Sequence, residues 1–172
     1  MATPTVRTAT TTDHTTTAFV THEVTNQPPP LEGYDLVFFV SGDVPALRSA
    51  RRARFLAATL REQPTLRDAG VPIDLLVGSA NDPSERYDGS LDAKLVVTTD
   101  GRNGGLANGE PFRATDPPEH VVDTYGAGDS FGAALAFALA RGDELSRALE
   151  LATRAGAAVL GGRGPYTSQL AF

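Results

Sequence analysis

Cysteine and tryptophan are absent from this sequence of 172 residues, and lysine occurs only once, at Lys94. The lack of thiols excludes disulfides, thiolate metal ligands and cysteine nucleophiles, and it leaves no argument for an oxidising compartment. The three histidines are not clustered, so a zinc centre has no support either. The composition therefore predicts a protein of the cytoplasm.

Clustered basic residues and long apolar runs are also lacking. The formal net charge is −6, whereas a protein that binds the nucleic-acid backbone needs grouped Lys and Arg. No apolar stretch approaches the roughly 20 residues that cross a bilayer, and the first residues lack the apolar core of a signal peptide. We expect a soluble chain whose partners include neither nucleic acid nor a membrane.

Hydrophobic residues make up 41% of the chain, which is enough for a single core. From Tyr34 onward, short apolar runs alternate with segments of helical character. The predicted strands cover residues 36–40, 54–59, 73–78 and 95–98, and the predicted helices between them cover residues 45–53 and 64–69. This alternation predicts right-handed crossovers and a mostly parallel sheet between helical layers, so the fold class is α/β.

The two ends of the sequence have different patterns. Residues 1–30 are rich in Thr and end in three prolines, which is compatible with a disordered tail and equally with an edge ribbon, because residues 16–21 have good strand propensity. Further on, Asn108-Gly109 predicts a hairpin within residues 102–120. Two helices are predicted to follow, over residues 127–140 and 144–160, each ending at glycine.

The run Val-Val-Asp-Thr-Tyr-Gly-Ala-Gly-Asp-Ser-Phe, residues 121–131, predicts a short strand, a turn of small residues and the start of a helix. The first N–H groups of a helix form an anion site, and the small residues Gly126, Ala127 and Gly128 let a phosphate approach them. Asp129 in the first turn could then accept the proton of a hydroxyl that attacks the phosphate. The alternative is a tight turn with Asp129 as a helix cap.

Residues 123–131 resemble the C-terminal signature of the ribokinase/PfkB sugar-kinase family. The resemblance implies a three-layer ribokinase-like sandwich and phosphoryl transfer from ATP with Mg²⁺ to the hydroxyl of a sugar or related alcohol. It makes Asp129 the catalytic base, and it places Asp123 and Thr124 near the site that holds a monovalent cation such as K⁺ in some members. The anion hole would be formed by the amides of Gly126, Ala127 and Gly128.

Other segments are similar to landmarks of the same family in the same order. Residues 97–104 look like the strand-end segment that contacts ATP, which implies contacts from Thr99, Gly101 and Gly104. Residues 155–166 resemble the segment that lines the adenine pocket, with Gly161 and Gly164 as the candidates.

Residues 82–85 look like the family's Asn-x-x-Glu, which helps to place Mg²⁺ and phosphate. Here Asp82 stands where Asn is usual. A carboxylate adds charge and cannot donate a hydrogen bond, so affinities for metal and phosphate should differ. Glu85 keeps the family residue. The alternative is that Asp82 caps a short helix and Glu85 completes a capping box.

Family members are nearly twice as long, and the resemblance covers residues 34–170. We expect residues 1–30 to be a remnant of the lid and edge strands or a tail, and residues 31–172 to form the catalytic half. The strands that hold the sugar are unmatched, so the fold should be incomplete, with an exposed edge that predicts aggregation, a homodimer or a missing partner segment. The function predicted is that of a truncated kinase, or of an inactive fragment that binds nucleotide as a scaffold.

A different enzyme class is suggested by residues 128–131, which resemble the Gly-Asp-Ser block of a family of serine esterases. Ser130 would then be the nucleophile. Such an enzyme needs a histidine base, which normally follows the block. All three histidines, His14, His22 and His120, precede Ser130, so this alternative is weaker.

Overall fold

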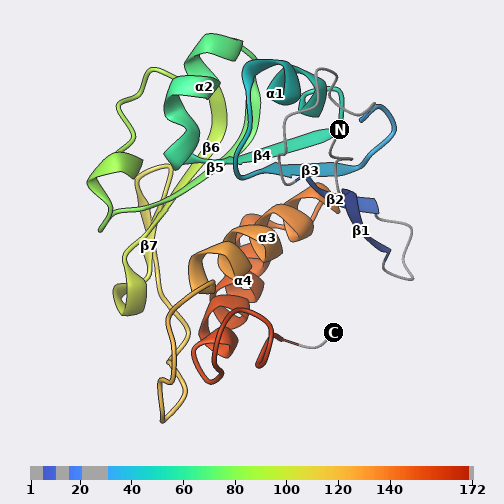
Figure 1. The fold of residues 1–172 in the computed structure, drawn as a ribbon. Coiled ribbons are helices and arrows are strands. Elements are labelled where there is room, and N and C mark those ends of the chain that lie inside the picture. The colour runs from blue at the N-terminus through green and yellow to red at the C-terminus, as the bar shows by residue number, and fades with distance from the viewer. Residues whose placement is uncertain (1–5, 11–15, 21–30, 171–172) are drawn as a thin grey trace. The chain divides into compact units, whose positions relative to one another are not determined.

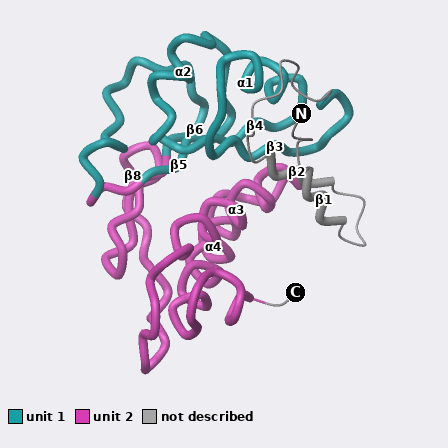
Figure 2. Tube along the Cα trace, viewed as in Figure 1, with its two compact units in different colours: residues 1–78, 82–96 teal, residues 79–81, 97–172 magenta. Residues whose placement is uncertain are grey.

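The computed structural model describes residues 6–10, 16–20 and 31–170. The chain divides into two compact units, shown in Figure 2: unit 1 contains residues 1–78 and 82–96, and unit 2 contains residues 79–81 and 97–172. The division passes through two strands, β5 (Ile73–Ser79) and β6 (Ala93–Thr99).

Unit 1 contains strands β1 (Val6–Thr10), β2 (Thr16–Val20), β3 (Leu36–Phe39) and β4 (Phe55–Thr59), followed by β5. β1 pairs antiparallel with β2, and the pairs β2–β3, β3–β4 and β4–β5 are parallel. Helices α1 (Val44–Ala50) and α2 (Gln63–Ala69) come between these strands in the sequence, and Figure 1 shows both helices on the same side of the strands. The parallel sheet with intervening helices is confirmed, and β2 shows that residues 16–20 form a strand.

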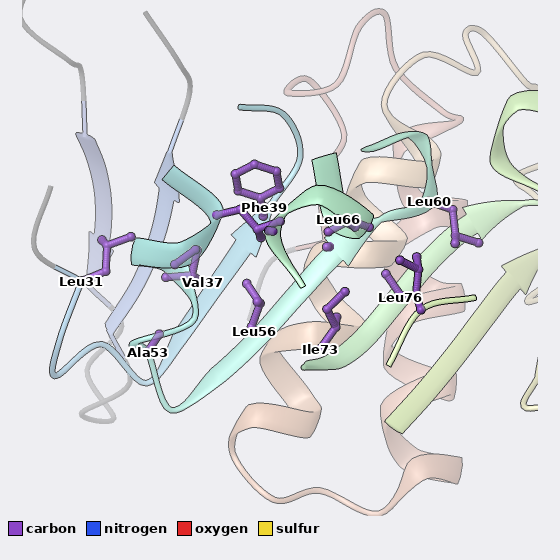
Figure 3. Close-up of a cluster of buried hydrophobic side chains, with 14 residues drawn as sticks. Leu31, Val37, Phe39, Ala53, Leu56, Leu60, Leu66, Ile73 and Leu76 are labelled. Carbon is purple, nitrogen blue, oxygen red and sulfur yellow. The ribbon is translucent and has the colours of Figure 1, made fainter. Parts of the chain in front are cut away.

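The core of unit 1 lies where α1 and α2 pack on one face of β3, β4 and β5. Figure 3 shows this cluster, in which the strand residues Val37, Leu56 and Leu76 lie with Leu66 of α2. Leu47 of α1 belongs to the same cluster. All four residues of β3 are buried, as its continuous apolar sequence predicts. Burial of apolar surface of this kind is the main force that stabilises the unit.

A buried carboxylate ties the middle strands of unit 1 together. Asp74 on β5 is only 7% exposed. It accepts hydrogen bonds from the Leu56 N–H of β4 (2.8 Å), from Arg51 Nη1 (2.6 Å) and from Lys94 Nζ of β6 (2.7 Å). Burial raises the pKa of Asp74, but the bonds from Lys94, the Leu56 N–H and Arg51 outweigh it and hold the pKa below its usual value.

Unit 2 contains the hairpin of β7 (Gly105–Ala107) and β8 (Glu110–Phe112), and β7 pairs antiparallel with the end of β6. The turn between β7 and β8 is formed by Asn108 and Gly109, both with positive φ (47° and 87°). Positive φ at both central residues is the requirement of a type I′ turn. The hairpin and its turn are therefore confirmed.

Two helices, α3 (Ala127–Ala140) and α4 (Leu145–Val159), complete unit 2. They pack closely because Gly156 of α4 has no side chain: a Cβ there would lie 3.2 Å from the Ala127 carbonyl oxygen. Both helices have the predicted positions. Among the described residues, no helix is long and apolar enough to span a membrane.

The prediction of a short strand at Val121 and Val122 is wrong. The two residues lie in irregular structure and are 53% and 58% exposed. The Val122 N–H donates to the Leu160 carbonyl oxygen (2.8 Å), but no strand ladder includes either residue in the described part of the chain. Their β-branched side chains favour a strand locally, and the absence of a paired neighbour prevents one.

Candidate functional site

The turn that precedes α3 has the small residues that the sequence analysis singled out. Gly126 caps the helix with φ +87°, a backbone conformation that glycine adopts without strain. A Cβ at Gly126 would also lie 2.5 Å from the Pro165 Cβ. Gly126 is therefore required by the backbone and by the packing of Pro165, apart from any role toward a ligand.

The first turn of α3 offers N–H groups to an anion. The Ala127 N–H points to the Thr124 carbonyl oxygen at 3.4 Å, and the Ser130 N–H donates to the Gly126 carbonyl oxygen at 2.9 Å. Within the described residues, this leaves the N–H groups of Gly128 and Asp129 without a backbone acceptor. A Cβ at Gly128 would meet nothing within 4 Å. A phosphate oxygen can thus approach the positive end of the helix at Gly128.

Asp129 lies in this same first turn, and it is exposed. A carboxylate at the start of a helix is favoured by the helix dipole, so its local position alone fits a cap as well as a base. Its exposure beside the available N–H groups allows a bound hydroxyl to reach it. The position is compatible with the proton acceptor that the sequence predicts.

Asp123 connects the turn before α3 to the segment that follows α4. Its Oδ1 accepts the Tyr125 N–H (3.0 Å) and its Oδ2 accepts the Gly164 N–H (2.9 Å). These two hydrogen bonds, the Thr124 N–H and the charge of Arg163 hold the pKa of Asp123 below its usual value. Asp123, Gly126 and Gly164 are thus brought together, whereas Thr124 is exposed on the turn.

The segment after β6 has a second set of contacts in unit 2. Asp100 accepts hydrogen bonds from Asn81 Nδ2 and Asn103 Nδ2, each 3.0 Å long. The bonds from Asn103 and Asn81 lower the pKa of Asp100. Asn81 and Asp100 were missed by the sequence analysis. The signal for Asn81 was its side-chain amide. The family resemblance expects an amide at position 82, and Asn81 stands one position earlier.

The predicted ATP-contacting residues of this segment have different surroundings. Thr99 ends β6, and its carbonyl oxygen accepts the Ala80 N–H (2.8 Å). Gly101 (φ +54°) is exposed with open space around it, whereas a Cβ at Gly104 would lie 2.0 Å from the Phe112 carbonyl oxygen. Gly104 is therefore explained by the packing of the hairpin, and Gly101 is the glycine that a ligand can approach.

Residues 82–85 form a separate group in unit 1, at the short 3₁₀ helix η2 (Pro83–Glu85). Asp82 Oδ1 accepts the Ser84 hydroxyl (2.7 Å) and the Ser84 N–H (2.9 Å), and these bonds lower the pKa of Asp82. The capping role of Asp82 that the sequence left open is confirmed. Whether Asp82 and Glu85 also place Mg²⁺ stays a prediction.

Glu85 is buried, and it is paired with an arginine that the sequence analysis missed. Arg61, in the 3₁₀ helix η1 (Leu60–Glu62), donates to Glu85 Oε1 from Nη2 (2.8 Å) and Nε (3.1 Å). The same Nη2 lies 4.0 Å from Asp82 Oδ2. No group of three or more His, Cys, Asp or Glu that could hold a metal occurs among the described residues. Two carboxylates still suit Mg²⁺, which takes one or two from protein and further oxygens from phosphate and water.

The remaining candidates lie in the closing segment and at Ser130. Gly161 is exposed near Pro118, and Gly164 has φ +70° with open space around it. Ser130 is half-buried in the first turn of α3. Of the three histidines, His120 is exposed, and His14 and His22 lie outside the described residues. No hydrogen bond between Ser130 and a histidine occurs among the residues that the structure describes.

The pfkB carbohydrate kinase family matches residues 70–171. The chain belongs to this family. The 5-dehydro-2-deoxygluconokinase of Geobacillus kaustophilus is 30% identical over 105 residues, which cover 51% of this chain and 31% of that kinase. The chain therefore spans about a third of this curated relative.

Solved structures of the kinase family show the same α/β fold. Ribokinase from Thermotoga maritima has a TM-score of 0.68 and 20% identity, with 82% of this chain and 55% of that chain covered. Ribokinase from Arabidopsis thaliana, solved with ribose and ATP, has a TM-score of 0.62 and 22% identity, with 79% and 53% covered. The ribokinase-like fold expected from the sequence is confirmed, and the chain spans about half of each structure.

Proposed function

We propose that the chain carries the phosphoryl-transfer half of an ATP-dependent kinase that acts on a sugar or related alcohol. The observation that carries this proposal is the first turn of α3, where the exposed Asp129 stands beside the available N–H groups of Gly128 and Asp129. Membership of the carbohydrate kinase family supports the reaction class. The Arabidopsis structure with ATP supports the phosphoryl donor.

In the proposed mechanism, the N–H groups at Gly128 and Asp129 bind phosphate oxygens and stabilise their charge. Asp129 would accept the proton of the acceptor hydroxyl while the hydroxyl oxygen bonds to the γ-phosphorus of ATP, and the bond from that phosphorus to the bridging oxygen would break to release ADP. Thr99, Gly101, Gly161 and Gly164 would contact the nucleotide, and Asp82 and Glu85 would help to hold Mg²⁺. When bound, ATP supplies the phosphoryl group and Mg²⁺ neutralises its negative charge.

The test compares the whole chain with an Asp129→Asn variant over a panel of sugars and nucleosides with MgATP, with ADP release as the readout. Removal of the base should lower turnover by about 100-fold or more, while calorimetry should show little change in nucleotide affinity. Asp143→Asn, at another exposed aspartate just after α3, is the matched control and should behave as the wild type. Equal and measurable turnover in the wild type and Asp129→Asn would exclude Asp129 as the base.

A second candidate is a nucleotide-binding scaffold without turnover. The sequence leaves this alternative open, and measurements of binding and turnover distinguish it from the kinase. Calorimetric binding of MgATP without ADP release for any acceptor would favour the scaffold. ADP release that depends on an acceptor would favour the kinase.

A further inference from the structure

Both oxygens of the Asp123 carboxylate are bonded to backbone N–H groups that lie far apart in the sequence. Oδ1 accepts the Tyr125 N–H, two residues away, at 3.0 Å. Oδ2 accepts the Gly164 N–H, 41 residues away, at 2.9 Å. A charged acceptor makes hydrogen bonds of this kind stronger than those between neutral groups. Asp123 is therefore a bridge between the turn before α3 and the segment after α4.

Two further contacts join the same segments. The Val122 N–H donates to the Leu160 carbonyl oxygen at 2.8 Å. At Gly126, the place of a Cβ is taken by Pro165, whose Cβ lies only 2.5 Å from that position. The contacts of Asp123, Val122 and Gly126 thus reach three successive parts of residues 160–165, on both sides of Gly164.

We propose that Asp123 is a positioning residue that fixes the closing segment, residues 160–166, against the turn of residues 123–127, so that its carboxylate acts on a ligand through this attachment. Loops lose conformational entropy when a ligand orders them. A closing segment that is already fixed would lose less conformational entropy when it binds its part of the ligand.

The consequence for a ligand rests on the proposed function. If the chain binds ATP, the turn receives the phosphates and the closing segment, with Gly161 and Gly164, receives the nucleoside. Loss of Asp123 should then weaken the binding of ATP much more than the binding of tripolyphosphate, which has no nucleoside. A ligand of K⁺ would instead make the effect depend on the cation in the buffer.

The experiment uses the whole chain as wild type, Asp123→Ala, Asp123→Asn and the control Asp116→Ala, at an exposed aspartate of unit 2. Amide hydrogen exchange is measured over residues 160–166 without ligand, and calorimetry gives the affinities for MgATP and tripolyphosphate. Every measurement is made in K⁺ and again in tetramethylammonium. In Asp123→Ala we expect faster exchange in both salts and about tenfold weaker MgATP binding in both, with tripolyphosphate affinity changed by less than about threefold.

Asp123→Asn keeps one acceptor oxygen, so it should fall between the wild type and Asp123→Ala, and it tests the proposal if the alanine variant does not fold. Unchanged exchange over residues 160–166 in Asp123→Asn and Asp123→Ala would overturn the proposal, as would a loss of affinity seen only in K⁺. If the wild type binds no nucleotide, the proposed function fails, while the exchange measurement still decides whether Asp123 fixes the closing segment.

Discussion

The two glycines Gly126 and Gly128, which stand two residues apart, should respond in opposite ways to alanine. Gly126 has φ +87°, and a Cβ there would lie 2.5 Å from the Pro165 Cβ. Gly128 lies within the first turn of α3, and a Cβ there would meet nothing within 4 Å. Gly126→Ala should therefore damage the fold of the turn, and Gly128→Ala should leave the fold intact.

The magnitudes follow from these surroundings. For Gly126→Ala, left-handed backbone costs about 1–2 kcal/mol in a residue with a Cβ, and the forced shift of Pro165 costs about 1–3 kcal/mol. The free energy of unfolding should fall by about 2–5 kcal/mol. For Gly128→Ala, alanine is the better helix residue, and the free energy of unfolding should rise by about 0.5–1 kcal/mol.

In Gly128→Ala, the affinity for MgATP should fall although the stability rises. The added methyl group occupies the open space beside the Gly128 and Asp129 N–H groups, so Gly128→Ala should weaken MgATP binding by about tenfold, which equals about 1.4 kcal/mol. Urea unfolding followed by circular dichroism measures stability, and calorimetry measures affinity. Full MgATP affinity in a stable Gly128→Ala variant would refute the anion site, and a fully stable Gly126→Ala variant would refute the role of Pro165.

The remaining predictions concern the stability of unit 1. Asp74→Ala leaves the buried Leu56 N–H without its acceptor and Arg51 without its counter-ion, so urea unfolding should show a free energy of unfolding about 3 kcal/mol lower. The exposed control Asp88→Ala, which loses a surface pair with Arg67, should lower it by less than about 1 kcal/mol. Equal losses in the two variants would contradict the role of burial. Because the pKa of Asp74 is lowered in the folded state, its contribution is complete above the ordinary aspartate value near pH 4 and disappears as the pH falls below it. Urea midpoints measured from pH 6 to pH 3 should therefore fall less steeply in Asp74→Ala than in the wild type, and parallel curves would contradict this linkage.

Much of the fold could be predicted because its signals are local. The apolar run of β3 and the helix over residues 127–140 are defined by neighbouring residues, so the sequence located both. Val121 and Val122 have a local strand signal as well, yet strand formation depends on a paired neighbour. The sequence contains no information at these two residues about whether such a neighbour exists.

The candidate site could be predicted only as far as its motif extends. The turn of residues 123–129 lies in one continuous segment, so its N–H groups and Asp129 could be recognised together. The bond from Gly164 to Asp123 joins residues 41 positions apart, and the bond from Asn81 to Asp100 joins residues 19 apart. No spacing rule links such pairs, so their roles appear only when the fold brings them together.

The negative charge of the two carboxylates at η2 is partly offset by Arg61. Asp82 adds a negative charge where the family resemblance expects an amide, which by itself would strengthen the attraction for a cation and weaken that for phosphate. Arg61 Nη2 lies 2.8 Å from Glu85 Oε1 and 4.0 Å from Asp82 Oδ2, so the three side chains carry one net negative charge. Arg61 therefore offsets one of the two carboxylates, and its hydrogen bonds are made to Glu85. Asp82 caps η2 through Oδ1, whereas a metal ion that binds Glu85 would have to compete with Arg61 for that carboxylate.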